Sequence, residues 1–558
     1  GITNSSSTGY QYYAQRYSMT DDFPFAEINV FQLGLYAQDK WTVSDKLNLT
    51  LGLRIDVPFF MTDLQSNDKV AAETYRDGIK IDISKYPNAK PQFSPRFGFN
   101  YKPFDDENGS LQIRGGTGLF TGTPPYVWIS NQAGNNGVLF GDLNVRAVKD
   151  KNDNIISDGR PSLGFTGNMD TYKPAEGSAT RSDIAITDPD FKYPSLWKSN
   201  IAADYKFGDG WVATVELLYS KDINAIYHDN IGLYRTEQFV NDGGAGNARP
   251  YYNGYYSDRE GNQKAANHVV MLRNTSKGHS LYTTFQLQKN FVDGILKGLY
   301  LNGSYSFGQS RGVTDGTSSV ATSAWKYRAA LDGNAEEVGY TAGSFDGRLL
   351  LSASYTANWS KYAATSFGLI YQRYRPFRYS YCYNGDANGD SQFSNDLMYI
   401  PANFDEVKDH LLPGDFDSQE DAWKAMNAFI EQDPYLSKHR GEYAERNGAV
   451  APFANQLDLS VSHDIKIYQK NGRSHTLRFS FNIANFLNLL NRNWGVVQTT
   501  VLGNQQYQFL TIPKGQGPSA ANNYTLKYTM AKDLDETFKD NLNDVSRWQM
   551  QFGIKYIF

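Results

Sequence analysis

The closing residues of the chain, VSRWQMQFGIKYIF (545–558), alternate between apolar and polar side chains. One column of this alternation is entirely apolar and consists of Trp548, Met550, Phe552, Ile554, Tyr556 and Phe558. The opposing column is mostly polar and consists of Gln549, Gln551, Gly553, Lys555 and Ile557. A period of two residues indicates an extended strand with two different faces. A soluble domain seldom exposes so long an aromatic column, so we expect this face to contact lipid.

The same alternation recurs along the chain. Apolar columns are formed by Phe31, Leu33, Leu35 and Ala37, by Leu47, Leu49, Leu51, Leu53 and Ile55, by Trp211, Ala213, Val215, Leu217 and Tyr219, and by Leu477, Phe479, Phe481 and Ile483. Repeated alternation over about ten residues is typical of transmembrane β-strands. The 39 Tyr, 33 Phe and 49 Gly also favour strands and turns over helices. No run approaches the roughly 18 consecutive apolar residues of a transmembrane helix, which excludes a helical membrane protein.

The connections between the expected strands fall into two length classes. Short links join strand pairs and read TVSDK, FDDENGS, GDG, VDGILKG, NWSKY and YQKNGRS. Long polar segments separate the pairs, at 123–196, 226–279, 310–345, 375–454 and 488–546. Short periplasmic turns and long extracellular loops are typical of outer-membrane barrels. We therefore predict an all-β fold, a transmembrane antiparallel β-barrel with long extracellular loops. Secreted sandwiches and propellers are the alternative, but they have few loops of this length.

The number of expected strands bears on the domain organisation. Six hairpins and the closing strand give about thirteen strands, with the C-terminus on the side of the short turns. Bacterial single-chain barrels have an even number of strands. We therefore interpret residues 1–558 as the C-terminal part of a larger barrel whose N-terminal strands lie outside this sequence.

Several stretches resemble one family of outer-membrane receptors. YAQDKW (36–41) is similar to a motif of TonB-dependent receptors, and further stretches resemble the Oar-like branch of Bacteroidetes and myxobacteria, namely FSPRFGFNY (93–101), LQIRGGTGLFTGTPPYVWISNQAGNNG (111–137), LWKSNIAADYKF (196–207), VELLYSKDINAIY (215–227), RGEYAERNG (440–448) and NIANFLNLLNRNWG (482–495). The resemblance implies a 22-stranded barrel with an upstream plug and N-terminal domain, both absent from this chain. It implies a Gram-negative outer-membrane location, partnership with TonB–ExbB–ExbD, and import of a large substrate such as a peptide, protein or glycan. It also implies that Phe558 is the signal recognised by the barrel-assembly machinery.

One loop carries a candidate metal site. In YNGDANGDSQFSNDLMYIP (383–401), Asp386, Asn388 and Asp390 have the spacing D-x-N-x-D, and Asp396 follows. Alternate carboxylates on a Gly-punctuated loop suit Ca²⁺, which prefers six to eight oxygen ligands. The EF-hand pattern is not met, because Ser391 follows Asp390 and Leu397 occupies position twelve. We predict a structural Ca²⁺ held by Asp386, Asn388, Asp390 and Asp396. An Asx-rich turn without a metal is the alternative.

Other features narrow the function. SQEDAWKAMNAFIEQ (418–432) predicts a helix capped by Ser418, with an apolar stripe of Trp423, Met426, Phe429 and Ile430. The single cysteine, Cys382, is expected in a loop without a disulfide. The seven histidines have no metal spacing and no catalytic signature is present, which argues against an enzyme. The net charge of −5 is spread along the chain and argues against nucleic acid as a partner.

Three functions are consistent with the sequence. The first is a TonB-dependent transporter. The second is an outer-membrane barrel that presents large loops or binds surface partner proteins without transport. The third is a soluble adhesin of stacked β domains. The loop segments PPYVWISNQ (124–132) and ARPYYNGYYSD (248–258) suit a peptide or sugar ligand, or simple packing between loops.

Overall fold

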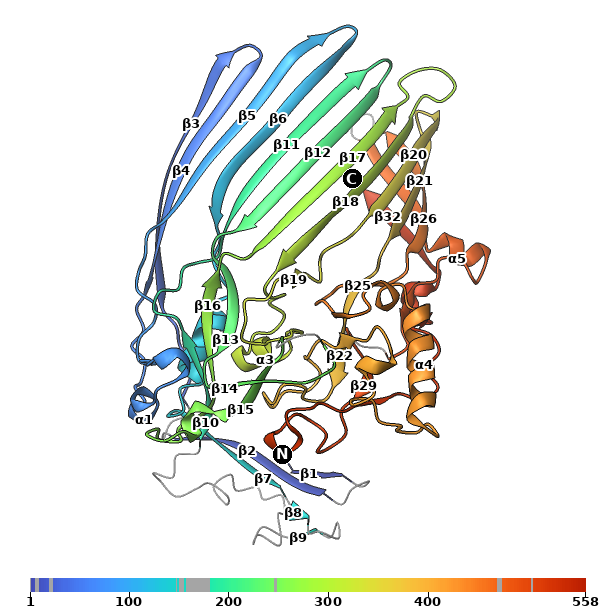
Figure 1. Cartoon of the computed structure of the whole chain (residues 1–558). Coiled ribbons are helices and arrows are strands. Elements are labelled where there is room, and N and C mark those ends of the chain that lie inside the picture. The colour runs from blue at the N-terminus through green and yellow to red at the C-terminus, as the bar shows by residue number, and fades with distance from the viewer. Residues whose placement is uncertain are drawn as a thin grey trace.

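One large antiparallel sheet dominates the computed structural model of the chain (Figure 1). The structure describes residues 1–558 except 1, 6–9, 20–23, 147, 150–154, 157–180, 245–247, 469–473 and 503–504. The sheet has fourteen strands, and all but the two-residue β19 (Gly339–Tyr340) follow one another in a single path. The path runs through β3 (Val30–Ser44), β4 (Leu47–Phe60), β5 (Gln92–Asp106), β6 (Gly109–Thr121), β11 (Ser195–Phe207), β12 (Trp211–Asp222), β17 (Gly278–Asn290), β18 (Leu299–Gly312), β20 (Arg348–Ser360), β21 (Ala363–Tyr374), β26 (Ala454–Tyr468), β27 (Ser474–Ala484) and β32 (Gln549–Ile557). The prediction of thirteen barrel strands is confirmed.

The expected short turns join neighbouring strands at one end of this sheet. The GDG link shows why glycine is needed there, because Gly208 and Gly210 adopt φ values of 50° and 82°. A Cβ at Gly210 would collide with the carbonyl oxygen of Asn290. Most of the YQKNGRS turn, residues 469–473, lies outside the described residues. GGTGLFTG (115–122) falls largely within β6, where a Cβ at Gly115 would lie 2.6 Å from the Asn200 oxygen of β11.

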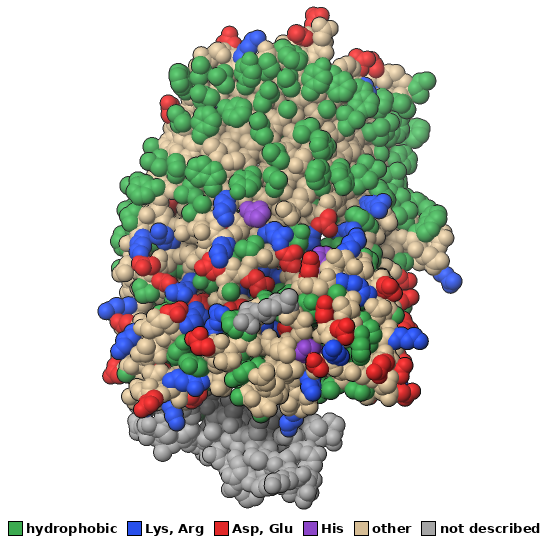
Figure 2. Space-filling model, in the orientation of Figure 1, with side chains coloured by type: hydrophobic (Ala, Val, Ile, Leu, Met, Phe, Trp, Pro, Cys, Tyr) green, Lys and Arg blue, Asp and Glu red, His purple; other side chains and the backbone are tan. Residues whose placement is uncertain are grey.

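The two faces of the sheet differ as the alternation predicts. The outward face exposes large apolar side chains and forms a continuous band in Figure 2. On the closing strand β32, Phe552, Ile554 and Tyr556 are 79%, 74% and 56% exposed. The inward face carries polar pairs between neighbouring strands, including Thr117–Ser199, Arg114–Asp204, Gln286–Asn302, Thr284–Ser306, Gln372–Gln456 and Arg478–Asp464. An apolar outside and a polar inside are the arrangement of a transmembrane barrel wall.

The remaining elements belong mainly to the long connections. The helices are α1 (Asp68–Ala72), α2 (Tyr126–Gly134), α3 (Ala321–Lys326), α4 (Gln419–Gln432) and α5 (Phe486–Leu490), with 3-10 turns at Arg76–Gly78, Tyr256–Asp258, Phe404–Glu406, Leu436–Lys438, Ala520–Asn522 and Asp544–Ser546. The additional strands are β1 (Ile2–Ser5), β2 (Tyr10–Ser18), β7 (Phe140–Arg146), β8 (Val148–Lys149), β9 (Ile155–Ile156), β10 (Ser182–Thr187), β13 (Ala225–Asn230), β14 (Leu233–Phe239), β15 (Pro250–Tyr255), β16 (Ala266–Thr275), β22 (Arg378–Asn384), β23 (Tyr399–Ile400), β24 (Glu442–Tyr443), β25 (Ala449–Val450), β28 (Gln498–Thr500), β29 (Gln506–Thr511), β30 (Thr529–Met530) and β31 (Phe538–Asp540). No helix among the described residues is long and apolar enough to cross a membrane.

The predicted helix is confirmed as α4. The side chain of its N-cap, Ser418, accepts the N–H of Asp421. Met426, Phe429 and Ile430 are buried, and Trp423 packs against the same core at partial burial. The apolar stripe therefore faces the protein interior, as its spacing predicts.

The long connections build small sheets and bury aromatic side chains in cores of their own. One expectation about them is corrected. Cys382 does not lie in a loop: it is a residue of β22 and is fully buried. Burial raises the pKa of its thiol, so the reactive thiolate is disfavoured.

Candidate functional site

The long connections assemble at one end of the sheet into a folded body, here called the loop domain (the described parts of 61–91, 122–194, 223–277, 313–347, 375–453 and 485–548), shown below the sheet in Figure 1. Its largest core combines residues from four separate connections, among them Val240, Ala329, Tyr381 and Phe509. Figure 2 shows this end covered with charged side chains, in contrast to the apolar band of the sheet. The loop domain is therefore water-facing outside and has its own apolar interior.

One sheet of the loop domain has four strands in the order β25-β22-β29-β30. Its middle strands β22 and β29 are parallel, with Ser380 opposite Gln506 and Tyr381 opposite Tyr507. Because side chains alternate across a strand, the two tyrosines share one face and enter the main core. Ser380, Gln506 and Gln508 instead line a cavity.

This cavity has a volume of about 590 Å³ and a mostly polar lining, and we call it the polar cavity. Its lining includes Thr314, Asp315, Thr317, Tyr327, Arg328, Ser380, Phe393, Ser394, Arg446, Asn447, Gln505, Gln506 and Gln508. Two aromatic side chains of the lining, Tyr327 and Phe393, are 59% and 68% exposed. Amides that donate and accept hydrogen bonds, combined with aromatic faces, suit a ligand with both polar edges and apolar faces.

Two buried arginines support the wall of the polar cavity. Arg328 and Arg446 are 5% and 3% exposed and both donate to the carbonyl oxygen of Val313. Arg446 also donates to the carbonyl oxygen of Gly312, at the end of β18. No carboxylate among the described residues forms an ion pair with either arginine. Burial lowers the pKa of Arg446 to about 10 and also lowers that of Arg328. These guanidinium groups hold the segment after β18 against the rest of the loop domain.

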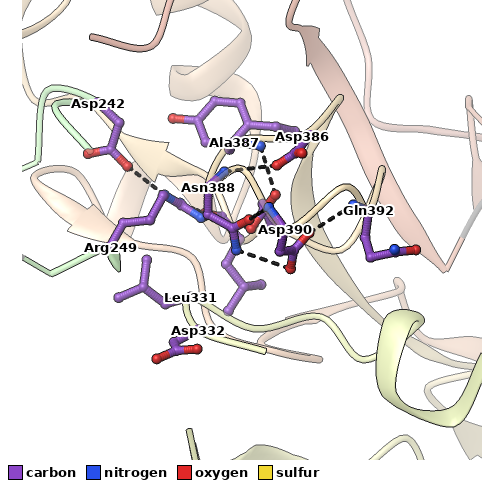
Figure 3. A network of polar contacts seen from close by, with 12 residues as sticks. Asp242, Arg249, Leu331, Asp332, Asp386, Ala387, Asn388, Asp390 and Gln392 are labelled. Carbon is purple, nitrogen blue, oxygen red and sulfur yellow. Dashed lines mark hydrogen bonds and ion pairs between the residues drawn. The ribbon is translucent and has the colours of Figure 1, made fainter. Parts of the chain in front are cut away.

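Three of the predicted metal-site residues, Asp386, Asn388 and Asp390, lie in the turn shown in Figure 3. The Asp386 carboxylate accepts the N–H groups of Asn388, Gly389 and Ser391 at 3.1, 2.6 and 2.8 Å. The Asp390 carboxylate accepts the N–H of Gln392 at 2.8 Å and the side-chain amide of Asn388 at 3.3 Å. The structure thus brings Asp386, Asn388 and Asp390 together in one Asx-rich turn.

Two carboxyl groups, those of Asp386 and Asp390, lie close together in this turn. Asp390 is 1% exposed, and its burial together with the neighbouring Asp386 charge raises the pKa of its carboxyl to about 7. Among the described residues, no three His, Cys, Asp or Glu side chains already converge as metal ligands. The oxygens are instead engaged by N–H groups, although a carboxylate oxygen has lone pairs for a second partner.

Asp396 lies at the other side of the turn and joins a buried ion-pair network. It accepts the N–H of Ala387 at 2.8 Å and the Arg249 guanidinium at 3.2 Å. Arg249 also donates to Asp242 at 2.9 Å and to the carbonyl oxygen of Leu397. All three charged side chains are at most 1% exposed. Burial opposes the charge on Arg249, but Asp242 and Asp396 outweigh it and raise its pKa.

The comparisons with known proteins assign the family. The family model described as "Outer membrane beta barrel domain" matches residues 8–521. The chain belongs to this outer-membrane β-barrel family. A comparison with curated proteins gives no match.

Several solved structures share a weak likeness with this barrel. They include the siderophore receptor PirA from Acinetobacter baumannii, at 8% identity and TM-score 0.39, covering 86% of this chain and 47% of that one. The copper transporter OprC gives 9% identity and TM-score 0.38, covering 86% of this chain and 48% of that one. A mutant of the ferric enterobactin receptor PfeA from Pseudomonas aeruginosa, in complex with enterobactin, gives 8% identity and TM-score 0.36, covering 89% of this chain and 47% of that one. The chain spans about half the length of these solved chains.

Family membership identifies what each face of the barrel wall contacts. The protein is located in the outer membrane, its apolar outward face contacts lipid, and its polar inward face lines the lumen. In such barrels the short turns are periplasmic and the long connections extracellular. The loop domain therefore lies at the cell surface.

Most residues that line the polar cavity carry no signal in the sequence that would predict their role. Gln506 and Gln508 occur in a segment without a motif, and the only signal around Arg446 is the family resemblance of its stretch. The one available local signal is the alternation of Tyr379, Tyr381 and Tyr383 with Ser380 and Cys382, which predicts a strand with an aromatic face. The tyrosine-rich segment 248–258 contributes Tyr252 to a core and Arg249 to the ion-pair network, which favours packing as its main role.

Proposed function

We propose that this chain is the barrel portion of a TonB-dependent outer-membrane transporter that imports a large substrate such as a peptide, protein or glycan. The observation that carries the proposal is the combination of a lipid-facing, lumen-lining sheet with a surface loop domain that contains the polar cavity. The resemblance to Oar-like receptors supports the same reading. No residue is assigned a catalytic role.

The proposed mechanism has three parts. The loop domain binds the substrate at the cell surface, with the polar cavity as a contact site. A plug then moves when TonB–ExbB–ExbD transmits the proton-motive force, and the substrate crosses along the polar lumen. We propose that the plug, an N-terminal domain and the remaining strands precede these residues in the whole protein, because a wide barrel is not filled by its own side chains.

Transport is tested by uptake of a labelled ligand. Peptide and oligosaccharide arrays identify a binding probe, and cells expressing the whole protein are then incubated with its fluorescent form. We expect a protonophore to abolish uptake while surface binding persists. Binding without protonophore-sensitive uptake would contradict the transporter. It would support the second candidate, a partner-binding barrel, and purification from native membranes should then yield a stoichiometric partner chain.

The presence of an upstream plug is tested by the mass of the native polypeptide, which is compared with the 62.8 kDa of these residues.

The polar cavity is tested by removing two of its amides. The double change Gln506→Ala and Gln508→Ala is expected to weaken binding of the array-selected probe roughly 5- to 150-fold, because each of the two lost hydrogen bonds contributes about 0.5–1.5 kcal/mol. Titration of the purified protein measures the affinity. Gln238→Ala, an exposed amide of the same domain away from the cavity, is the matched control and should bind normally. Equal affinity for all three proteins would remove the cavity from the binding site.

We also propose that the 386–396 loop binds a structural Ca²⁺ through Asp386, Asn388, Asp390 and Asp396. Its support is that Asp386, Asn388 and Asp390 share one turn and that the Asp386 and Asp390 carboxyl groups lie close together. Their oxygens keep lone pairs for a cation beside their N–H donors. Added Ca²⁺ should raise the melting temperature of the loop domain by several degrees, because a ligand of the native state stabilises it. Chelation with EDTA should reverse the rise, and Asp386→Asn with Asp390→Asn should abolish it. A melting temperature indifferent to Ca²⁺ would leave the turn as a hydrogen-bonded Asx turn only.

For Phe558 we propose the role of barrel-assembly signal, on the basis of the family resemblance. The side chain is 92% exposed, so its contribution to packing within this chain is small. Phe558→Ala should therefore reduce the amount of heat-modifiable, folded barrel in outer membranes without changing the melting temperature of the barrel that does assemble. Phe31→Ala, at another exposed aromatic of the sheet, serves as control. A lower melting temperature with normal assembly would make Phe558 a packing residue instead.

A further inference from the structure

A short projection leaves the barrel wall between β27 and β28. It comprises residues 485–495 and contains the five-residue helix α5. Figure 1 shows α5 standing out sideways from the molecule, at the level where the long strands give way to the loop domain. Figure 2 shows hydrophobic side chains on this projection, near the lower boundary of the apolar band, and a Lys or Arg side chain at its tip. The projection thus continues the apolar band outward.

Hydrogen bonds at its base hold the projection in one shape. The backbone N–H of Asn485 donates to the Asp458 carboxylate of β26 at 2.8 Å. The Asn485 side-chain amide donates to the carbonyl oxygen of Gly495 at 2.8 Å. This bond joins the first residue of the projection to its last. Gly495 has φ 64°, and a Cβ there would collide with the Asn485 side chain. The base is therefore a defined structure that requires glycine at this position.

A second asparagine organises the tip. The Asn488 side-chain amide donates to the carbonyl oxygens of Arg492 and Trp494, at 3.0 Å each. These bonds fold residues 491–494 back over α5. Leu490 and Trp494 are nevertheless 59% and 53% exposed, and Arg492 is exposed as well. The hydrogen-bonded projection therefore presents a leucine, a tryptophan and an arginine outward.

We propose that the 485–495 projection is a lateral membrane anchor in the outer leaflet. Leu490 and Trp494 lie at the boundary between acyl chains and headgroups, and Arg492 binds lipid phosphate. Three observations favour lipid over a protein partner. The projection follows directly from β27, whose outward Phe479 and strand partner Ile554 are exposed in the lipid-facing band. Tryptophan and arginine are suited to the membrane interface and to phosphate. The exposed apolar side chains are few, whereas a stable protein interface buries about 800 Å² per partner.

The experiment is depth-dependent quenching by brominated lipids. Leu490→Cys is labelled with an environment-sensitive fluorophore, and Cys382 stays unlabelled because it is buried in the native protein. The labelled protein is reconstituted without partners into nanodiscs of phosphatidylcholine and phosphatidylglycerol, brominated either near the headgroup or near the chain end. We expect strong quenching, greater with shallow than with deep bromines. Glu431→Cys, exposed on α4 of the loop domain, should not be quenched, and Leu281→Cys on β17 should be quenched within the bilayer.

The outcome at residue 490 decides the proposal. Quenching as weak as that of the Glu431→Cys label would overturn it and would leave a protein partner as the occupant of the projection. The label at residue 490 sits on an already exposed side chain, so folding should be preserved, and heat-modifiable migration verifies it. As a second measurement, Arg492→Gln should reduce the quenching in discs that contain phosphatidylglycerol. Unchanged quenching would remove the phosphate contact from the proposal.

Discussion

Replacing Arg249 with methionine is expected to destabilise the loop domain by about 3–5 kcal/mol, because it leaves buried carboxylates without their counter-charge. The guanidinium of Arg249 is fully buried between Asp242 and Asp396 and lies over the rings of Tyr383 and Tyr443. The Arg249 side chain links two of the long segments, 226–279 and 375–454, since Arg249 and Asp396 are 147 residues apart in the chain. Loss of this one side chain should therefore loosen the packing of whole segments against one another.

The measurement must separate the loop domain from the barrel wall. Limited proteolysis of the Arg249→Met protein should cleave the 226–279 and 375–454 segments faster than in the unaltered protein, while the strands stay protected. Lys408→Met is the control, because its partner Asp405 is 86% exposed and such surface pairs contribute about 0–1 kcal/mol. If the two variants were cleaved at the same rate, the network would not hold the segments together.

Phe285→Arg and Thr284→Arg should differ greatly in their effect on the stability of the folded barrel, although the residues are neighbours on β17. Phe285 is outward and 46% exposed on the apolar band, opposite Val215 and Tyr305 of the adjacent strands. A charge in the bilayer at such a position costs about 2–4 kcal/mol near the midplane. Thr284 points to the other face, where its hydroxyl is hydrogen-bonded to that of Ser306 at 2.9 Å. An arginine there meets a polar lumen.

We expect Phe285→Arg to lower the yield and denaturant resistance of the folded barrel, and Thr284→Arg to change both far less. Heat-modifiable migration after folding into lipid, followed along a urea series, gives the comparison. The reverse order would mean that the assignment of lipid and lumen faces is wrong. An equal loss of yield and denaturant resistance in both variants would indicate a sheet buried on both faces, as in a soluble adhesin of stacked β domains.

The strands of the wall are the part of this protein that the sequence determines by itself. Each strand lies between lipid and lumen, so its alternation follows from its own residues and needs no information from other segments. The strand count, the short turns and the outward column of β32 were accordingly predictable. Helix α4 was predictable for the same reason, because its Ser418 cap and its apolar stripe are local signals.

The loop domain was decided by the tertiary structure. Its segments show little periodicity, and its central strands β22 and β29 pair in parallel across more than one hundred residues of sequence. The sheet brings these segments to one end of the molecule, where they bury aromatic side chains against each other. The burial of Cys382, the polar cavity and the partner of Asp396 depend on that assembly.

Asp396 illustrates the difference. The sequence places it beside Asp386 and Asp390 and predicts a shared metal site, since spacing along the chain is the only information available. The structure adds Arg249 from a distant connection and gives Asp396 a buried cation partner. Local pattern determines which face of a strand meets lipid, whereas the partner of a buried charge depends on which distant segments the fold brings together.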